Sequence, residues 1–294
     1  MAEAMVKSDN LVKIYKTKDI EVLALQGLDL NVEAGEFMAI IGNSGSGKST
    51  FLNMIGGLDR PSAGKLYVDV KNLFTMTNKE LVDYKRNTVG FVWQNNARNL
   101  VPYLSVLENI KMPMQFSNLK DKKEKALELL DMVGLSKKKD NKLYQLSGGE
   151  QQRIAIAISL ANSPKVLLAD EPTGAVDRAT ADVIFDVFKR LNRELGLTLI
   201  VVTHDVELSS KVERVAAIRD GKISSELLLR EAVDFEEDGA HIDGWGRKTH
   251  QKEFVVVDRA GRIQIPREVL NDMGLDGNKV VMDYKDGRIT IDKP

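Results

Sequence analysis

The stretch FMAIIGNSGSGKST, residues 37–50, decides the fold of this chain. Its apolar run, residues 37–41, is typical of a buried strand, and residues 42–49 match the phosphate-binding loop pattern that joins a strand to a helix. The glycines let backbone N–H groups and the helix N-terminus point at phosphate oxygens. Lys48 would reach the β- and γ-phosphates, and the Ser49 hydroxyl would bind magnesium. We therefore expect nucleotide contacts from Gly42, Asn43, Ser44, Gly45, Ser46, Gly47, Lys48, Ser49 and Thr50.

Short apolar runs alternate with longer helical patterns on both sides of this loop. The expected strands are residues 37–41, 89–93, 166–169 and 198–203. Two expected helices begin at Lys48 and at Gly148, and a third spans about residues 179–195. This alternation predicts an α/β domain with a largely parallel, buried sheet, ending near residues 224–228.

Length, charge and composition limit the possible functions. The 294 residues suggest two domains, and 43% hydrophobic residues suffice for a sizeable core. Lys and Arg number 42 against 43 Asp and Glu, so any contact with nucleic acid or anionic lipid must be local. The absence of cysteine excludes disulfides, zinc–thiolate sites and cysteine nucleophiles. We expect no signal peptide, and no apolar run approaches the ~20 residues of a membrane-spanning helix.

An acidic pair ends the stretch VLLADE, residues 166–171. In a parallel sheet this places Asp170 and Glu171 at the carboxyl edge, beside the phosphate loop. Alone, such a pair is ordinarily the start of a solvated loop. With the phosphate loop, Asp170 suits a magnesium ligand, directly or through water, and Glu171 is placed to orient the water that attacks the γ-phosphate.

The stretch LSGGEQQR, residues 146–153, opens another helix with a serine and two glycines. It could form a second anion-binding helix N-terminus. Ser147 and Glu150 also have the spacing of a capping box, which alone would indicate an ordinary helix start. The order of segments favours a functional role, because this stretch lies between the phosphate loop and the Asp170–Glu171 pair.

In these three segments and their order, the chain resembles the ATPase subunits of ABC transporters over residues 6–228. The resemblance implies a P-loop fold, with a mixed sheet and a helical subdomain, that binds ATP and Mg²⁺. It assigns Tyr15 to stacking on adenine, although a tyrosine there could also belong to the core. Gln94 matches the Q-loop glutamine, which touches magnesium and the attacking water and contacts the transport partner. His204 matches the switch histidine, which hydrogen-bonds the γ-phosphate.

The same resemblance implies that two chains work together. Asp177 matches the D-loop aspartate, which lies at the subunit interface in the family. Ser147, Gly148, Gly149 and Glu150 match the signature motif, which closes over the nucleotide held by the other subunit. Because one chain carries one of each motif, we expect a head-to-tail homodimer. The expected catalytic residues are Lys48, Gln94, Glu171 and His204. The expected magnesium ligands are Ser49, Gln94 and Asp170.

Within this family, the stretch GGLDRPSAGK, residues 56–65, and the LSGGEQQR stretch resemble the MacB, LolD and FtsE group. This implies an ATPase that drives a MacB/FtsX-type membrane permease and lies at the cytoplasmic face of the cell membrane, bound through that permease. An FtsE-like ATPase that regulates cell-wall enzymes without transport is an open alternative. A DNA-binding regulatory ATPase is the less favoured one.

A change of composition at residues 229–251, acidic and then glycine-rich, predicts a linker between domains at 1–228 and 252–294. The last domain is expected to be small and mostly β. Its expected elements are strands at residues 254–257, 262–265, 279–284 and 288–291, a helix at 267–273, and a hairpin turn at Asp286 and Gly287.

The sequence of this last domain resembles the swapped-hairpin domain of the AbrB regulators over about residues 254–292. Those domains bind DNA as intertwined dimers through loop arginines, and Arg259, Arg262 and Arg267 match them. Eight Lys and Arg balance eight Asp and Glu in residues 252–294, whereas a DNA-binding unit usually has a basic excess. A module of this size rarely folds alone, so we favour a dimerisation tether.

Overall fold

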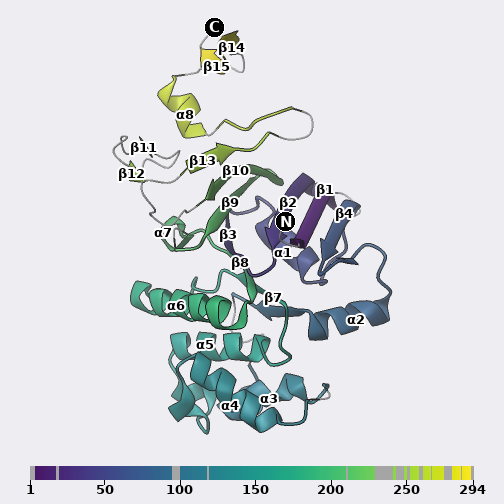
Figure 1. Ribbon diagram of the computed structural model, residues 1–294, viewed down its shortest axis with the longest axis vertical. Coiled ribbons are helices and arrows are strands. Elements are labelled where there is room, and N and C mark those ends of the chain that lie inside the picture. The colour runs from purple at the N-terminus through teal and green to yellow at the C-terminus, as the bar shows by residue number, and fades with distance from the viewer. Residues whose placement is uncertain are drawn as a thin grey trace. The chain divides into compact units, whose positions relative to one another are not determined.

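The computed structural model divides the chain into two compact units, Met1–Ile223 and Ser224–Pro294, which we describe separately (Figure 1). It describes residues 4–17, 20–94, 100–117, 119–209, 211–228, 241–242, 248–249, 252–257, 261–265, 267–274, 280–285 and 287–292. No helix in these ranges is both long and apolar enough to cross a membrane.

The centre of the first unit is a parallel sheet, in which the strands lie in the order β9-β3-β8-β7-β6. These strands are β3 (Phe37–Ile41), β6 (Val89–Val92), β7 (Val166–Asp170), β8 (Thr198–Val202) and β9 (Arg214–Arg219). Every residue of β3 and β8 is buried, as expected for strands that are covered on both faces. The predicted α/β class and its parallel core are confirmed.

Helices follow these strands and also form a separate layer of the first unit. They are α1 (Lys48–Ile55), α2 (Asn78–Asn87), α3 (Val106–Met114), α4 (Lys122–Met132), α5 (Gly148–Ser159), α6 (Arg178–Leu195) and α7 (Val206–Ser209). Figure 1 shows α3, α4 and α5 together in the teal region, with α5 against α6. Phe185 and Phe188 of α6 pack on Phe37 of β3, which joins this layer to the core. The predicted starts of α1 and α5 are confirmed.

A second, antiparallel sheet with strand order β2-β1-β4-β5 was not expected from the sequence. It consists of β1 (Ala4–Lys16), β2 (Glu21–Glu33), β4 (Ala63–Val68) and β5 (Lys71–Asn72). Buried and exposed side chains alternate along β1, but the buried positions shift from even to odd numbers: they are Val6 and Ser8, and then Leu11 and Lys13. The irregularity lies at Asn10, which has a left-handed φ of 48°. Such a bulge breaks the period of two by which a strand is recognised.

The second unit contains β13 (Lys252–Val255), which pairs antiparallel with the last residues of β10 (Lys222–Leu228). It also contains β11 (His241–Ile242), β12 (Lys248–Thr249), α8 (Arg267–Asp272), β14 (Val281–Lys285) and β15 (Arg288–Asp292). The β14–β15 hairpin and α8 agree with prediction. Lys285 is paired with Arg288, so the turn has two residues; Gly287 has a φ of 76°, and Asp286 lies outside the described residues.

The predicted strand at residues 262–265 is wrong, because these residues form no regular structure. An alternating pattern becomes a strand only where a neighbouring strand accepts its hydrogen bonds. No strand within the described residues pairs with this segment. Most of residues 229–251, the predicted linker, and Arg259 lie outside the described residues.

Candidate functional site

The carboxyl ends of three neighbouring strands bring the candidate residues of the first unit together. The phosphate loop follows β3, Asp170 ends β7, and His204 follows β8. Because β8 lies between β3 and β7 in a parallel arrangement, all three ends lie at one edge of the sheet. Ligands bind at such an edge in open α/β sheets.

The phosphate loop has a backbone that only glycine allows at two positions. Gly42 has a φ of 151°, and a Cβ there would lie 2.2 Å from the Ile218 carbonyl oxygen. Gly47 has a φ of 105° and caps α1 without any side-chain hydrogen bond. Gly47 has no side chain that could accept a hydrogen bond from the backbone N–H groups in the first turn of α1. Such N–H groups can bind phosphate oxygens.

Lys48 is buried under this loop, with its ammonium group donating to the carbonyl oxygens of Gly42 at 2.8 Å and Asn43 at 2.9 Å. Burial lowers the pKa of Lys48, and the carboxylates of Glu171 and Asp170 oppose that effect. The cation is thus held at the loop by backbone oxygens and by acidic neighbours. It is placed to receive the additional negative charge of a phosphate.

Ser49 and Asp170 provide oxygen ligands of the kind that Mg²⁺ prefers. The Ser49 hydroxyl donates to Asp170 Oδ1 at 3.0 Å, joining the start of α1 to the end of β7. The described residues contain no group of three or more His, Asp or Glu side chains that could hold a metal without help. Magnesium that arrives with a nucleotide needs only one or two protein ligands, so this pair fits it.

Glu171 and His204 form a hydrogen-bonded pair at the same edge. His204 Nδ1 lies 2.8 Å from Glu171 Oε2, and because a carboxylate only accepts, Nδ1 carries the hydrogen and Nε2 is directed elsewhere. Glu171 has a left-handed φ of 48°, and its N–H donates to the Val202 carbonyl at 2.9 Å. This strained backbone conformation, held by the bond to Val202, fixes the Glu171 side chain at the sheet edge beside His204.

Gln94 lies beside the turn that follows Glu171. A Cβ built on Gly174 would be 3.3 Å from Gln94 Nε2, and the Gly174 N–H donates to the Glu171 carbonyl at 3.1 Å. The amide of Gln94 therefore belongs to the same cluster. The five residues after it, 95–99, are outside the described part of the chain.

Tyr15 belongs to a small network that the sequence did not reveal. Its hydroxyl donates to Asp59 Oδ2 at 2.7 Å, and Lys13 Nζ lies 2.6 Å from Asp59 Oδ1 and 4.7 Å from the centre of the Tyr15 ring. Burial and the bond to Asp59 raise the pKa of Tyr15. Tyr15 is 39% exposed, so its hydroxyl end is held while part of the side chain remains accessible for stacking. Lys13 and Asp59 are 46 positions apart, so no local pattern signals their contact.

The LSGGEQQR segment forms the capping box that its spacing predicted. Ser147 Oγ accepts from the Glu150 N–H at 3.3 Å, and Glu150 Oε2 accepts from the Ser147 N–H at 2.9 Å. This backbone hydrogen bond from Ser147 is the main cause of the lowered pKa of Glu150. A Cβ on Gly149 would lie 2.1 Å from Thr180 Cγ2, whereas one on Gly148 would meet no atom within 4 Å.

Asp177 caps α6 and lies near the same segment through Thr180. Its Oδ1 accepts from the Thr180 N–H at 3.0 Å, and its Oδ2 accepts from the Thr180 hydroxyl at 2.8 Å. These bonds, the backbone one first, lower the pKa of Asp177. The predicted residues thus form three groups: the sheet edge with Lys48 and Glu171, the Tyr15 network, and the starts of α5 and α6.

Comparison with known proteins agrees with this arrangement. The family model described as ABC transporter matches residues 25–174. An uncharacterised ABC transporter ATP-binding protein of Methanocaldococcus jannaschii is 43% identical over 77% of this chain and 98% of its own. The lipoprotein-releasing system ATP-binding protein LolD of Idiomarina loihiensis is 39% identical over 77% and 99%. The macrolide export ATP-binding/permease protein MacB of Rhodopirellula baltica is 41% identical, over 77% of this chain but 33% of its own length.

Comparison with solved structures also finds ATP-binding cassettes of ABC transporters. A dimeric structure of the Methanocaldococcus jannaschii cassette, in a post-hydrolysis state bound to ADP and Pi, has a TM-score of 0.70 and 42% identity. The match covers 77% of this chain and all of that one. The described core therefore has the P-loop fold of these cassettes, with its mixed sheets and helical layer.

Proposed function

The chain belongs to the ABC transporter family as an ATP-binding motor subunit, and from this we propose how its own residues bind and hydrolyse ATP. The observation that carries the proposal is the meeting of Lys48, the Ser49–Asp170 pair and the Glu171–His204 pair at one sheet edge. Cation, metal ligand and water-orienting carboxylate are the parts that phosphoryl transfer to water requires.

In this proposal the loop from Gly42 to Thr50 holds the phosphates through backbone N–H groups, and the Lys48 ammonium binds the β- and γ-phosphates. Tyr15 stacks on the adenine ring. Ser49, Asp170 and Gln94 are the residues that would hold Mg²⁺, directly or through water. When bound, that ion neutralises charge on the β- and γ-phosphates.

Glu171 orients and polarises the water that attacks the γ-phosphorus, and the bond from phosphorus to the bridging oxygen breaks to give ADP and phosphate. His204 is held by its Nδ1 and presents Nε2 to the γ-phosphate. Gln94, beside the Glu171 turn, also contacts the attacking water in this proposal. Each of these steps uses a group that already lies at the sheet edge.

The working unit in this proposal is a homodimer. Ser147, Gly148, Gly149 and Glu150 of one copy close over the phosphates held by the loop of the other copy, and Asp177 lies at the interface. Support comes from Gly148, which faces open space within its own chain, and from the dimeric form of a 42% identical cassette. The space beside Gly148 leaves room for the phosphates of a nucleotide held by another copy, at the N-terminus of a helix.

Replacing Glu171 with Gln tests the catalytic assignment. The amide keeps the shape but cannot polarise water, so we expect ATP turnover to fall at least ~100-fold. Binding of a fluorescent ATP analogue should be retained, because Lys48 and the loop are unchanged. Glu194→Gln, at an exposed pair with Arg190, is the matched control and should hydrolyse ATP normally. Hydrolysis retained by Glu171→Gln would refute the assignment.

We propose a MacB/FtsX-type permease as the membrane partner, with this chain at the cytoplasmic face of the membrane. Support comes from the relatives named MacB and LolD, which are 41% and 39% identical. The test is to purify the chain from detergent-solubilised membranes and to place it in vesicles with ATP, together with the membrane protein that copurifies. Substrate movement would favour transport, and stimulation of cell-wall enzymes without movement would favour the FtsE-like alternative.

For the C-terminal unit we propose an AbrB-like swapped-hairpin tether between two copies. Met282, Tyr284 and Ile289 share one face of the β14–β15 hairpin, because Tyr284 is paired with Ile289 and Met282 is two residues from Tyr284. Their side chains are 66%, 74% and 64% exposed. An isolated two-stranded hairpin is marginally stable in water, so a second copy that covers this face would stabilise it.

Tyr284→Ser with Ile289→Ser in the full chain tests the tether by sedimentation without nucleotide. We expect the unmodified chain to be dimeric and this variant to be monomeric, with Tyr144→Ser, at an exposed tyrosine of the first unit, as control. A dimer that survives the change would contradict the tether. Binding of the full chain to DNA in a gel-shift series at rising salt would instead favour the DNA-binding alternative.

A further inference from the structure

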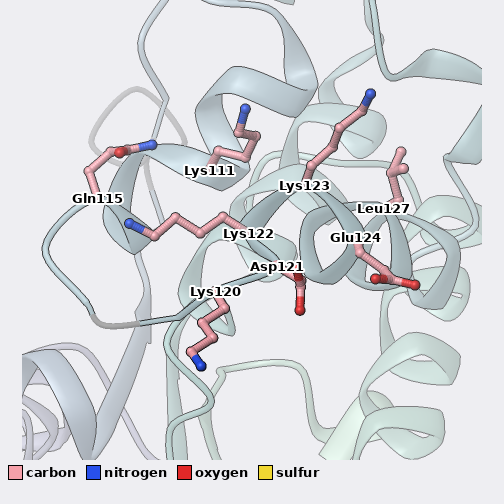
Figure 2. A pocket seen from close by; sticks show the side chains of 8 residues that line it. All are labelled: Lys111, Gln115, Lys120, Asp121, Lys122, Lys123, Glu124 and Leu127. Atoms are coloured by element: carbon pink, nitrogen blue, oxygen red, sulfur yellow. The ribbon is translucent and has the colours of Figure 1, made fainter.

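A lysine-rich hollow lies where α3 ends and α4 begins. Its volume is about 610 Å³, and its charged lining consists of Lys111, Lys120, Lys122, Lys123, Asp121 and Glu124. Figure 2 shows Lys111 on α3, Lys122 and Lys123 at the start of α4, and Lys120 on the segment before α4, with Lys111 and Lys123 extending the same way in this view. We call the four lysines the lysine surface. The sequence as a whole is balanced in charge, whereas Lys120, Lys122 and Lys123 lie close together in the chain and the fold adds Lys111 from α3.

The four lysines of the lysine surface outnumber the two carboxylates that line the hollow with them, Asp121 and Glu124. Among the described residues, no ion pair joins any of its four lysines to an acidic side chain. The N-cap residue of α4, Asp121, makes no side-chain capping hydrogen bond, so side chains leave the first turn of α4 uncapped. The carboxylates of Asp121 and Glu124 offset the helix dipole at this point, so the excess of positive charge comes from the four lysines. The hollow therefore attracts anions.

Exposed apolar side chains occupy the same bend of the chain. Met112 is 46% exposed, Phe116 67% and Leu119 37%. They lie at spacings of four and three residues, in the last turn of α3 and the segment that follows it. They do not line the hollow, but they are close to its lysines along the chain. Exposed apolar side chains near lysines are the composition of a surface that enters a lipid interface.

We propose that the α3–α4 bend, through the lysine surface and the apolar side chains at Phe116, contacts the headgroups of an anionic membrane. A single soluble anion is a poorer occupant, because Lys120 and Lys123 are exposed and each such contact is screened by salt. A membrane offers many anions to several lysines at once and also accepts Phe116. This contact goes beyond the proposed binding to a permease, because it needs lipid alone.

The test uses the full chain in flotation assays with vesicles of phosphatidylcholine, with or without phosphatidylglycerol. We expect binding only with phosphatidylglycerol. Lys111→Gln with Lys122→Gln and Lys123→Gln should weaken that binding by roughly tenfold or more, since each lysine adds to attraction at an anionic surface. Helix α2 offers the matched control: Lys79→Gln and Lys85→Gln, with Lys65→Gln, remove three exposed lysines elsewhere and should leave binding unchanged.

Phe116→Ser tests the contribution of the exposed apolar side chains to vesicle binding. Val82→Ser, at a 50% exposed valine of α2, is its control. We expect weaker vesicle binding from the first and no change from the second. ATP hydrolysis by every variant reports that it is folded, since none of these residues lies in the nucleotide site. No binding to phosphatidylglycerol vesicles, or equal binding by the triple lysine variant, would overturn the proposal. Release by inorganic phosphate, but not by chloride at equal ionic strength, would also overturn it in favour of a small-anion site.

Discussion

Helices α1 and α5 both begin at glycine-rich segments, but their first turns differ. Gly47 precedes α1 in a left-handed conformation and supplies no side-chain cap. Ser147 precedes α5 in an extended conformation and closes a capping box with Glu150. The start of α1 is thus shaped by backbone alone, whereas the start of α5 is already partly neutralised by a carboxylate.

This difference indicates a division of labour between the two helix starts. The start of α1 contains Lys48 and the Ser49 that bonds Asp170, and in our proposal these residues bind the phosphates within one chain. The start of α5 is stable without a ligand, and its Gly148 faces open space. A surface that is folded beforehand and exposed at one glycine suits docking on a nucleotide from another copy. Four substitutions break or sharpen this comparison.

Gly47→Ala should have the largest effect. Its Cβ would lie 2.6 Å from the Ala24 carbonyl oxygen and 2.7 Å from Leu25 Cδ2, at a φ that side chains rarely adopt. We expect ATP affinity to fall by about two orders of magnitude and the free energy of unfolding by ~1–3 kcal/mol. Nucleotide titration and urea unfolding measure both. Gly45→Ala, where a Cβ meets no atom within 4 Å, is the control and should lose less.

Gly149→Ala comes next, because its Cβ would be 2.1 Å from Thr180 Cγ2. The α5–α6 contact must then open, which we expect to lower the free energy of unfolding by ~1–3 kcal/mol. Thr180→Ser removes the clashing methyl and keeps the hydroxyl that bonds Asp177. The double variant should recover most of the loss in urea unfolding. A double variant no more stable than Gly149→Ala would mean that this contact is not the cause.

Ser147→Ala removes the cap of α5 and should lower the free energy of unfolding by ~1 kcal/mol. At α1 the comparable change is Ser46→Ala. The hydroxyl of Ser46 is buried and has no hydrogen-bond partner among the described residues. We expect that change to leave stability nearly unaltered, since no bond is lost. Thermal unfolding of the two variants compares the two helix starts directly. Equal losses would contradict the difference between them.

Glu150→Gln should have the smallest effect, a few tenths of a kcal/mol near neutral pH. The pKa of Glu150 is lowered on folding from its ordinary value of 4.5, chiefly by the Ser147 N–H. Its charge therefore stabilises the fold above pH 4.5, and this contribution is lost as the pH falls through the folded pKa. The stability difference between Glu150→Gln and the unmodified chain should shrink over that range in urea titrations. A constant difference would show that the carboxylate charge plays no part.

The sequence was sufficient to predict that the phosphate loop and the Asp170–Glu171 pair lie at one sheet edge, because the signals for the loop and its strands are local. Buried parallel strands such as β3 appear as continuous apolar runs, and the loop at Gly42–Gly47 follows directly. The Tyr15 network could not be predicted, since Asp59, which precedes β4, is brought to Lys13 by the antiparallel pairing of β4 with β1. The prediction of a strand at residues 262–265 was wrong because alternating apolar and polar residues do not show whether a partner strand exists.

The central claim is that the phosphate loop of one copy faces the α5 start of another. The natural chain has no cysteine, so Ser44→Cys and Gly148→Cys place unique thiols at the two exposed positions. In a Glu171→Gln background, a short bismaleimide should join two chains when ATP is added. We expect ATP-dependent crosslinked dimers only when both cysteines are present. Crosslinking that ignores ATP, or none at saturating ATP, would contradict the account.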